Sequence, residues 1–420
     1  MKGRIVTISV FLLLFASERS SFAETLSMED TLLLAYRQNP KMKEARESIE
    51  AQIGRKITDS AFKGPEVSFE IGGFKSQEVS GEKVTPDKSL DSFEVIQPFD
   101  PPGVRFLKGS IAEDNVRIAK GNLATIWASV YKDIKTAYSN TLFRREAVRV
   151  FETSLNSARQ FRDAVEGQYQ SGKALKSESI RARVEVLKAE SELFEAEKDF
   201  KTALIELNLL LDRSPEEEII LKDSLDYRFI QLKKDGLVAQ ALSRRADVLN
   251  QKIRLASARK DYLRSQLSFL PEPFVGFSRT REDYDNDTSI LLGGKLPLWD
   301  FNLGEMKEKN AVKAQEEIRL RALENEVSAE VIRALSEAEL SMKKVEIQKK
   351  AFEEVSELQK QASIQYQEGD LSFLGYLESL KTAKEIKLSY FESLKNHYKT
   401  MAEFERAIQS VPIPEGKATQ

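Results

Sequence analysis

The stretch LPEPFVGFSRTREDYDNDTSILLGGKLPLWDFNLG, residues 270–304, decides the fold of this chain. Residues 274–277 are too aromatic and glycine-rich for a helix, and residues 290–298 are apolar. The segment between them, 280–288, is almost entirely polar. We therefore predict strands at about 272–280 and 288–298, joined by a polar loop. A lone two-stranded ribbon is marginal in water, so further strands must complete its sheet.

An earlier segment has the same pattern. Val67, Phe69 and Ile71 alternate with polar residues, which is the period of a strand with one apolar face. A polar loop spans residues 74–90, and a second apolar run ends at Pro98. This pattern predicts strands at about 65–74 and 91–98.

Long helices account for most of the remaining sequence. We predict helical hairpins at about 103–211 and 302–408, with the helix from 302 to 366 roughly 95 Å long. The return helix of the first hairpin carries a heptad seam, formed by Ala182, Val186, Ala189, Leu193, Ala196, Phe200, Ala203, Leu207 and Leu210. A second partial seam lies beside it, formed by Val184, Leu187, Phe194, Leu204 and Leu211. Two seams indicate helical neighbours on both sides, as in a ring of helices.

The chain is built as two copies of one plan. Tyr366 and Gly369 at the second predicted hairpin turn are spaced as Tyr169 and Gly172 are at the first. We predict a first repeat over residues 24–235, with a connector at about 212–235, and a second repeat over 236–410. The final residues, 411–420, are expected to be disordered. A duplicated unit of helix, ribbon and hairpin is a strong architectural signal.

Composition excludes several classes of function. The 420 residues are 31% charged, which is typical of long helices, and the net charge of -3 provides no basic surface for nucleic acid. There is no cysteine, and the single histidine, His397, is expected on a helix surface. No phosphate loop, nucleophile motif or metal-ligand cluster occurs. We therefore expect no enzyme, no catalytic, cofactor-binding or metal-ligating residues, and no cofactor.

The first 23 residues have the pattern of a secretory signal peptide. Lys2 and Arg4 precede an apolar run at 5–16, and a small-residue cleavage motif ends at Ala23. No later segment has the apolar length of a transmembrane helix. If the protein enters a membrane, we expect it to do so through strands.

Several short motifs, taken together and in order, resemble the TolC family of outer-membrane efflux ducts. They are residues 26–30 with Ala35 and Asn39–Pro40, then Ala241, Arg245 and Asp247–Val248, then Leu270–Pro271 and residues 296–300, and the Tyr169/Gly172 and Tyr366/Gly369 turns. Each motif alone is weak, but they span nearly the whole chain after the signal peptide.

The resemblance implies a mainly helical fold with a small membrane β part. Three chains would close a twelve-stranded β-barrel continuous with a periplasmic helical barrel. The protein would then be a passive homotrimeric exit duct in the outer membrane, in contact with its lipid. It would receive substrate from a periplasmic adaptor and an inner-membrane pump of the resistance-nodulation-division type. The general pattern resembles the heavy-metal cation-efflux subgroup, with drug efflux and type I secretion as alternatives of the same fold.

Site residues are also implied by the resemblance. In the family, acidic side chains just past the second tip turn narrow the periplasmic entrance. The matching positions here are Gly375, which departs from the acidic pattern, and Glu378, which keeps it. Glu368 and Asp370 lie nearby and are further candidates for the constriction. The alternative is that these are solvated turn and helix residues. The tip turns, with Tyr169, Gly172, Tyr366 and Gly369, would contact the adaptor, although the glycines are equally explained by a tight turn. Phe99, Trp299 and Phe301 are candidates for an interfacial aromatic belt or for ordinary packing between strand and helix.

Two other classes of protein stay open. A periplasmic adaptor also has long helical hairpins, but it would need lipoyl-like and small β-barrel segments around a single hairpin. An extracytoplasmic coiled-coil scaffold without a pore would not need two ribbons at matching places.

Overall fold

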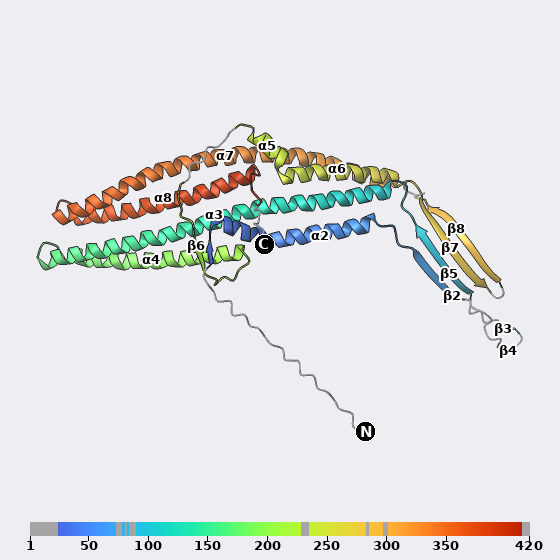
Figure 1. Cartoon of the computed structure of the whole chain (residues 1–420), viewed down its shortest axis with the longest axis horizontal. Coiled ribbons are helices and arrows are strands. Elements are labelled where there is room, and N and C mark those ends of the chain that lie inside the picture. Colours follow the sequence, from blue (N-terminus) through green and yellow to red (C-terminus); the bar gives the residue numbers. More distant parts are fainter. Residues whose placement is uncertain are drawn as a thin grey trace, which may run out of the picture.

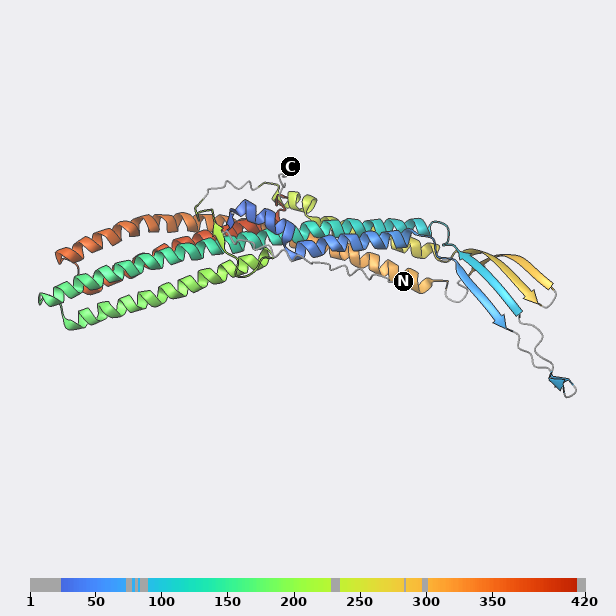
Figure 2. The ribbon, with the colours of Figure 1, turned by 60° about the horizontal axis from the view of Figure 1, so that its bottom comes forward.

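A computed structural model describes residues 24–72, 78–79, 82–83, 90–227, 235–282, 285–296 and 301–413. The predicted signal peptide, most of the first polar loop and Trp299 lie outside these residues. The molecule is long and curved, with a helical body at one end and a small sheet at the other (Figures 1 and 2).

The helical body is built around two pairs of long helices, and four shorter helices pack against them. The helices are α1 (Met28–Gln38), α2 (Pro40–Ser60), α3 (Val104–Gln170), α4 (Lys176–Leu210), α5 (Leu237–Arg244), α6 (Ala246–Leu267), α7 (Leu303–Glu368) and α8 (Phe373–Ala407). α3 has 67 residues and α7 has 66, so each is roughly 100 Å long. α3 packs against α4 and α7 packs against α8, while α3 also contacts α2, α6 and α8. Within the described residues, no helix combines the length and the apolar character needed to cross a membrane.

The internal duplication extends to individual helix lengths. α4 and α8 both have 35 residues and both return from the tip to the middle of the molecule. There a junction residue caps each of them: Asn39 Nδ2 donates to the Leu210 carbonyl at 2.7 Å, and Arg245 Nη1 donates to the Ala407 carbonyl at 3.2 Å. Leu210 and Ala407 are the last residues of α4 and α8, so the two repeats are joined to their return helices in the same way.

The predicted heptad seam of α4 is confirmed as a packing face. Its small and branched residues Ala182, Val186, Ala189, Ala196, Ala203 and Leu207 are buried. The second seam is divided within one chain: Val184, Leu187 and Phe194 are exposed, whereas Leu204 and Leu211 pack in the central core. α7 likewise buries one face and exposes Ile332, Leu340 and Ile347 on another. Each hairpin therefore carries apolar side chains that its own chain leaves uncovered.

Among the described residues, the strands form three sheets. They are β1 (Glu24–Leu26), β2 (Glu66–Gly72), β3 (Glu78–Val79), β4 (Glu82–Lys83), β5 (Leu90–Pro98), β6 (Ile219–Leu221), β7 (Glu272–Glu282) and β8 (Asp285–Lys295). The main sheet is antiparallel with the order β2-β5-β7-β8, so the two ribbons complete one another through β5 and β7. β1 pairs with β6 in parallel, and β3 pairs with β4.

Four segments differ from the sequence prediction. The expected polar loop 74–90 contains the paired strands β3 and β4, and β5 already begins at Leu90. The expected polar loop 280–288 is largely strand, because β7 runs to Glu282 and β8 begins at Asp285. The connector contributes β6, whose partner β1 was not predicted. At the C-terminus, which was expected to be disordered from 411, Val411 packs on the central core and Trp127 Nε1 donates to the Pro412 carbonyl at 3.1 Å.

Candidate functional site

The two hairpin tips are built from the same backbone turn. The Gln168 carbonyl accepts the N–H of Lys173 at 2.8 Å, and the Gln365 carbonyl accepts the N–H of Asp370 at 2.9 Å. These bonds close each long helix by reaching back over its last turn, as in a Schellman motif. The residue that follows the turn glycine is basic in the first repeat, Lys173, and acidic in the second, Asp370.

A glycine makes each turn possible. Gly172 has φ +73° and Gly369 has φ +87°, which is the left-handed region. No heavy atom outside the immediate chain lies within 4 Å of where a Cβ would be at either glycine. The requirement for glycine is therefore conformational and not steric. This supports the tight-turn explanation, and a role in contacting an adaptor stays a prediction.

The two tip tyrosines have different environments. Tyr169 is 38% exposed, whereas Tyr366 is 6% exposed. Tyr366 lies in an aromatic cluster in which the Phe161 ring is about 5 Å from those of Tyr366, Phe373 and Tyr376. Phe161 belongs to α3, so this cluster ties the first hairpin to the second at their tips. Within one chain, Tyr169 presents its ring to solvent and Tyr366 does not.

The acidic candidates are spread over the second tip. Glu368 ends α7, Asp370 follows in the turn, and Glu378 lies in the second turn of α8; all three are exposed. Gly375, where the resemblance would place another acid, is covered by Leu371, whose Cδ1 would be 2.8 Å from a Cβ at that position. A larger side chain would therefore have to displace Leu371. The constriction itself stays a prediction, because it requires further copies of the chain.

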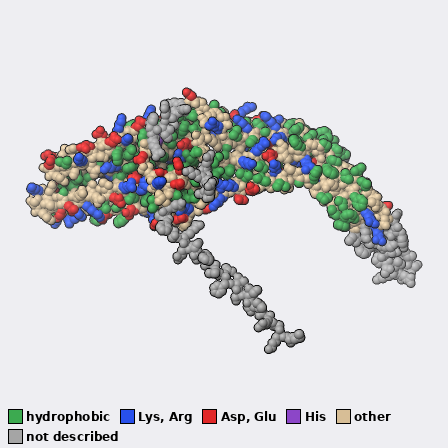
Figure 3. Space-filling model, viewed as in Figure 1, with side chains coloured by type: hydrophobic (Ala, Val, Ile, Leu, Met, Phe, Trp, Pro, Cys, Tyr) green, Lys and Arg blue, Asp and Glu red, His purple; other side chains and the backbone are tan. Residues whose placement is uncertain are grey.

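The main sheet has one apolar and one polar face. Strand register places Val67, Val95, Phe277 and Ile290 in a single cross-strand row on one face. The row beside it holds Val275 and Leu292, and the row on the other side holds Phe69 and Phe93, whose rings are 5.0 Å apart. The apolar side chains are open to the surroundings, with Ile290 and Leu292 each 77% exposed. Figure 3 shows hydrophobic side chains gathered over this end of the molecule.

The opposite face of the sheet is polar and acidic toward the β7–β8 turn, whereas Ile96, Leu291 and Phe274 make it partly apolar toward the helices. Ser68, Glu94, Ser278 and Ser289 form one cross-strand row. The next row contains Glu70, Ser92, Thr280 and Asp287. The contiguous exposed apolar surface on the first face of the sheet marks an interface with another molecule or with lipid. The polar face opposite it is suited to water.

Two aromatic candidates lie where the sheet meets the helices. The Phe99 N–H donates to the Pro273 carbonyl at 2.8 Å, and the Phe99 ring packs edge-on against Phe62, with centroids 6.2 Å apart. Phe301 is 57% exposed just before α7. Both positions suit an interfacial belt, and Phe99 also has the packing role proposed as its alternative. The third candidate, Trp299, is not among the described residues.

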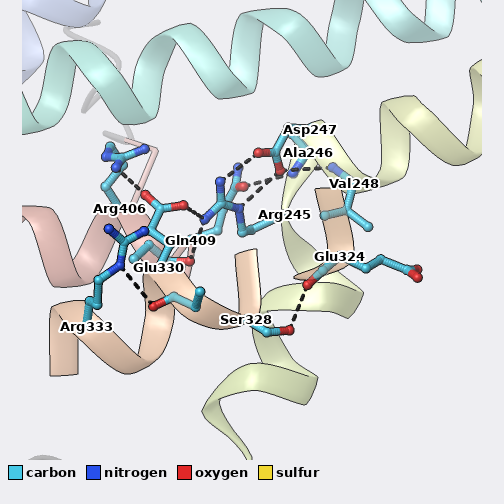
Figure 4. A network of polar contacts seen from close by, with 12 residues as sticks. Arg245, Ala246, Asp247, Val248, Glu324, Ser328, Glu330, Arg333, Arg406 and Gln409 are labelled. Carbon is cyan, nitrogen blue, oxygen red and sulfur yellow. Dashed lines mark hydrogen bonds and ion pairs between the residues drawn. The ribbon is translucent and has the colours of Figure 1, made fainter. Parts of the chain in front are cut away.

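A buried polar network holds the junction between α5 and α6 (Figure 4). Arg245 is 7% exposed, and its guanidinium donates to both carboxylate oxygens of Asp247 and, at 2.5 Å, to Glu330 of α7. Arg406 of α8 pairs with the other Glu330 oxygen. Burial acts to raise the pKa of Asp247, but the hydrogen bonds and charge of Arg245 outweigh it, so the pKa is lowered. The network ties the α5–α6 junction to α7 and α8, as a structural clamp.

His397 lies inside the molecule, so its predicted surface position is wrong. It is 4% exposed, its Nδ1 is 2.9 Å from the Ser341 hydroxyl, and its ring packs edge-on against Tyr227. Burial lowers the pKa of His397, which favours the neutral ring. The polar neighbours Lys395, Asn396 and Lys399 pointed to a surface position, but a helix can bury one residue among several exposed ones.

Solved structures share this architecture over nearly the whole chain. The outer-membrane channel MtrE of Neisseria gonorrhoeae aligns with a TM-score of 0.77 at 16% identity, covering 91% of this chain and 88% of that chain. CusC, described as forming a transmembrane channel, aligns with a TM-score of 0.77 at 14% identity, and the alignment covers 91% of both chains. The outer-membrane channel CmeC of Campylobacter jejuni aligns with a TM-score of 0.75 at 15% identity, covering 91% of this chain and 85% of that chain. The chain has the TolC-like fold.

This TolC-like likeness lies in structure and not in overall sequence. Neither a protein-family model nor a curated protein sequence matches the chain. The motifs that predicted the TolC-like fold are those at turns, junctions and ribbon ends, where backbone geometry restricts the residue. The helix faces between them need only the right pattern of apolar and polar residues, which many different sequences provide.

Two groups of residues were missed by sequence reasoning. Glu330 and Arg406 of the buried network carry no local signal, since charged residues are frequent on every helix. Arg279 and Arg281 on the apolar face of the TolC-like sheet were assigned to the end of a strand and to a loop. Period-two alternation from Val275 and Phe277 would have placed both arginines on that face.

Proposed function

We propose that three copies of this chain form an outer-membrane exit duct of a tripartite efflux system. The duct is passive, and it receives substrate from a periplasmic adaptor and an inner-membrane pump of the resistance-nodulation-division type. The observation that carries the proposal is the two-faced sheet, with its exposed apolar rows on one side and its acidic rows on the other. Lipid would cover the first face, and water in the pore would cover the second.

The edges of the sheet support closure by further copies. β2 and β8 are the outer strands of the described four-stranded sheet, and they run in opposite directions because the order β2-β5-β7-β8 is antiparallel throughout. The β8 edge of one copy can therefore pair with the β2 edge of the next in the same antiparallel sense. Closing the sheet into a barrel pairs the N–H and C=O groups of both edge strands. This pairing is required in hydrocarbon, where no water is present to bond them. Three copies give twelve strands.

The helical body supports the same assembly. The exposed apolar residues of α4 and α7 need partners, and neighbouring copies arranged in a ring supply them. Helices roughly 100 Å long would extend the pore far into the periplasm. The tips, at the end away from the sheet, would then face the adaptor and the pump (Figure 1).

The acidic face favours cations as cargo. Glu70, Glu94 and Asp287 on the polar face would be repeated threefold around the pore, and Lys295 is the basic residue that shares this face among the described strand residues. A ring of carboxylates attracts cations. We propose heavy-metal cations as the cargo, with drugs and secreted proteins as the alternatives that the same fold would serve.

Electron microscopy of the detergent-extracted protein, after membrane fractionation, tests the assembly. We expect it in the outer-membrane fraction as a three-fold hollow cylinder well over about 100 Å long. A soluble solid rod or a monomer would overturn the duct in favour of a scaffold. For cargo, deletion of the gene should raise sensitivity to heavy-metal salts; increased sensitivity to lipophilic drugs alone would transfer the proposal to drug efflux.

A further inference from the structure

Two arginines lie on the apolar face of the sheet. Strand β7 alternates, so Arg279 and Arg281 share a face with Val275 and Phe277. Both arginine side chains are exposed. They follow the apolar rows toward the turn between β7 and β8, which is the end of the sheet away from the helices (Figure 1).

The strand register gives each arginine its neighbours. Arg279 lies between Phe93 of β5 and Thr288 of β8, neither of which is charged. Arg281 lies between Asp91 and Asn286 in the next row. The Arg279 row also contains Phe69, which is 72% exposed, so a guanidinium and an aromatic surface share the outward face.

Strand length places this pair at the edge of a hydrocarbon layer. β7 and β8 each have 11 residues, and tilted transmembrane strands use about 9–11 residues to cross a bilayer. Arg281 is the last residue but one of β7, so it lies where the strand leaves the layer. An outward-facing arginine strongly destabilises a barrel at the bilayer midplane but is tolerated near the interface.

We propose that Arg279 and Arg281 bind the phosphate group of an anionic lipid in the leaflet beside the β7–β8 turn. The proposal rests on the proposed function, because it requires the apolar face to meet lipid. A guanidinium binds a phosphate through two parallel hydrogen bonds and can do so at the hydrocarbon boundary. The exposed Phe69 ring supplies an apolar surface for an acyl chain beside the headgroup. Each protomer would carry one such site.

Native mass spectrometry of the intact detergent-solubilised protein tests this site. The probe is dioleoyl phosphatidic acid, with dioleoyl phosphatidylcholine as the reference lipid. We expect the apparent Kd for phosphatidic acid to rise about fivefold for each charge removed by Arg279→Gln and Arg281→Gln. Phosphatidylcholine binding should be unchanged. The double substitution Arg279→Lys with Arg281→Lys should recover only part of the lost affinity, because lysine keeps the charge but cannot form two parallel hydrogen bonds to one phosphate.

A matched pair on α7 controls for net charge. Lys307 and Arg321 are exposed on the helix that follows the sheet, so Lys307→Gln with Arg321→Gln removes the same charge elsewhere. Wild-type affinity in the sheet variant, or an equal loss in the control pair, would overturn the lipid site. If the wild-type protein is not a trimer or retains no lipid of either kind, the proposed duct fails, and the lipid site fails with it.

Discussion

The ring of Tyr366 stacks on that of Tyr376, with centroids 5.0 Å apart and planes inclined by 14°. Tyr366 belongs to the last turn of α7 and Tyr376 to the first turn of α8, so the stack closes the second tip. The corresponding residue of the first tip, Tyr169, is partly exposed. The internal repeat thus supplies a buried and an exposed tyrosine in the same type of turn.

Tyr366→Ala is expected to destabilise the tip by about 3 kcal/mol, because it removes a large buried ring from the cluster around Phe161. Hydrogen exchange of the amides at the ends of α7 and α8 measures this local loss. Tyr169→Ala is the matched control and should change the free energy of local opening, measured by exchange, by no more than about 0.5 kcal/mol. Similar effects at both positions would show that the aromatic cluster does not stabilise the tip.

Glu378→Ala is expected to lower the preference of the reconstituted pore for cations, since three carboxylates would leave its entrance. The measurement is the reversal potential across a planar bilayer under a salt gradient. Glu354→Ala removes the same charge from an exposed position along α7 and should leave the potential unchanged. Unchanged selectivity in Glu378→Ala would remove this residue from the constriction.

Arg245→Met is expected to lower the free energy of unfolding by about 3 kcal/mol, because Asp247 would be left without its guanidinium partner and Glu330 would lose one of two. The midpoint of denaturant unfolding measures it. Arg321→Met is the control: Arg321 is exposed on the same helix as Glu330 but lies outside the network, and removing it should change stability by no more than about 0.5 kcal/mol. Equal midpoints for the two variants would contradict the clamp.

Stability is expected to fall as the pH drops below about 6.5 because of His397. Burial lowers the pKa of the folded histidine, so the unfolded chain takes up a proton before the folded chain does. The histidine's contribution is therefore complete above the ordinary pKa and is lost as the pH falls toward the folded value, with a slope of at most about 1.4 kcal/mol per pH unit.

Denaturant unfolding measured between pH 5 and 7.5 tests this dependence. Because the chain has one histidine, His397→Gln should flatten the dependence in the upper part of this range. A slope that persists in His397→Gln would assign the pH dependence to carboxylates instead.

The fold could be predicted from sequence because its decisive residues act locally. Val67 and Phe69 alternate with polar residues, and Gly172 and Gly369 each allow a backbone conformation that closes a hairpin. Ser27 and Asp30, three residues apart, form a capping box at the start of α1, with the Asp30 N–H donating to Ser27 Oγ at 3.2 Å.

Features that depend on distant partners could not be predicted in this way. β1 is three residues long and pairs with β6, and nothing in such a short segment indicates a partner so far along the chain. The burial of His397 depends on Tyr227 and Ser341, which belong to other elements. The acidic candidates stay predictions because the arrangement they would form requires three chains.

The pairing of β5 with β7 imposes an order on folding. β5 ends at Pro98 and β7 begins at Glu272, so the apolar face of the first ribbon exists long before its partner strands have been made. At ordinary synthesis rates, the delay is on the order of ten to thirty seconds. During that time β2 and β5 can pair with each other, but β5 lacks its β7 neighbour. The backbone edge of β5 and the apolar face beside it therefore stay open to other copies of the chain until the second ribbon pairs with the first.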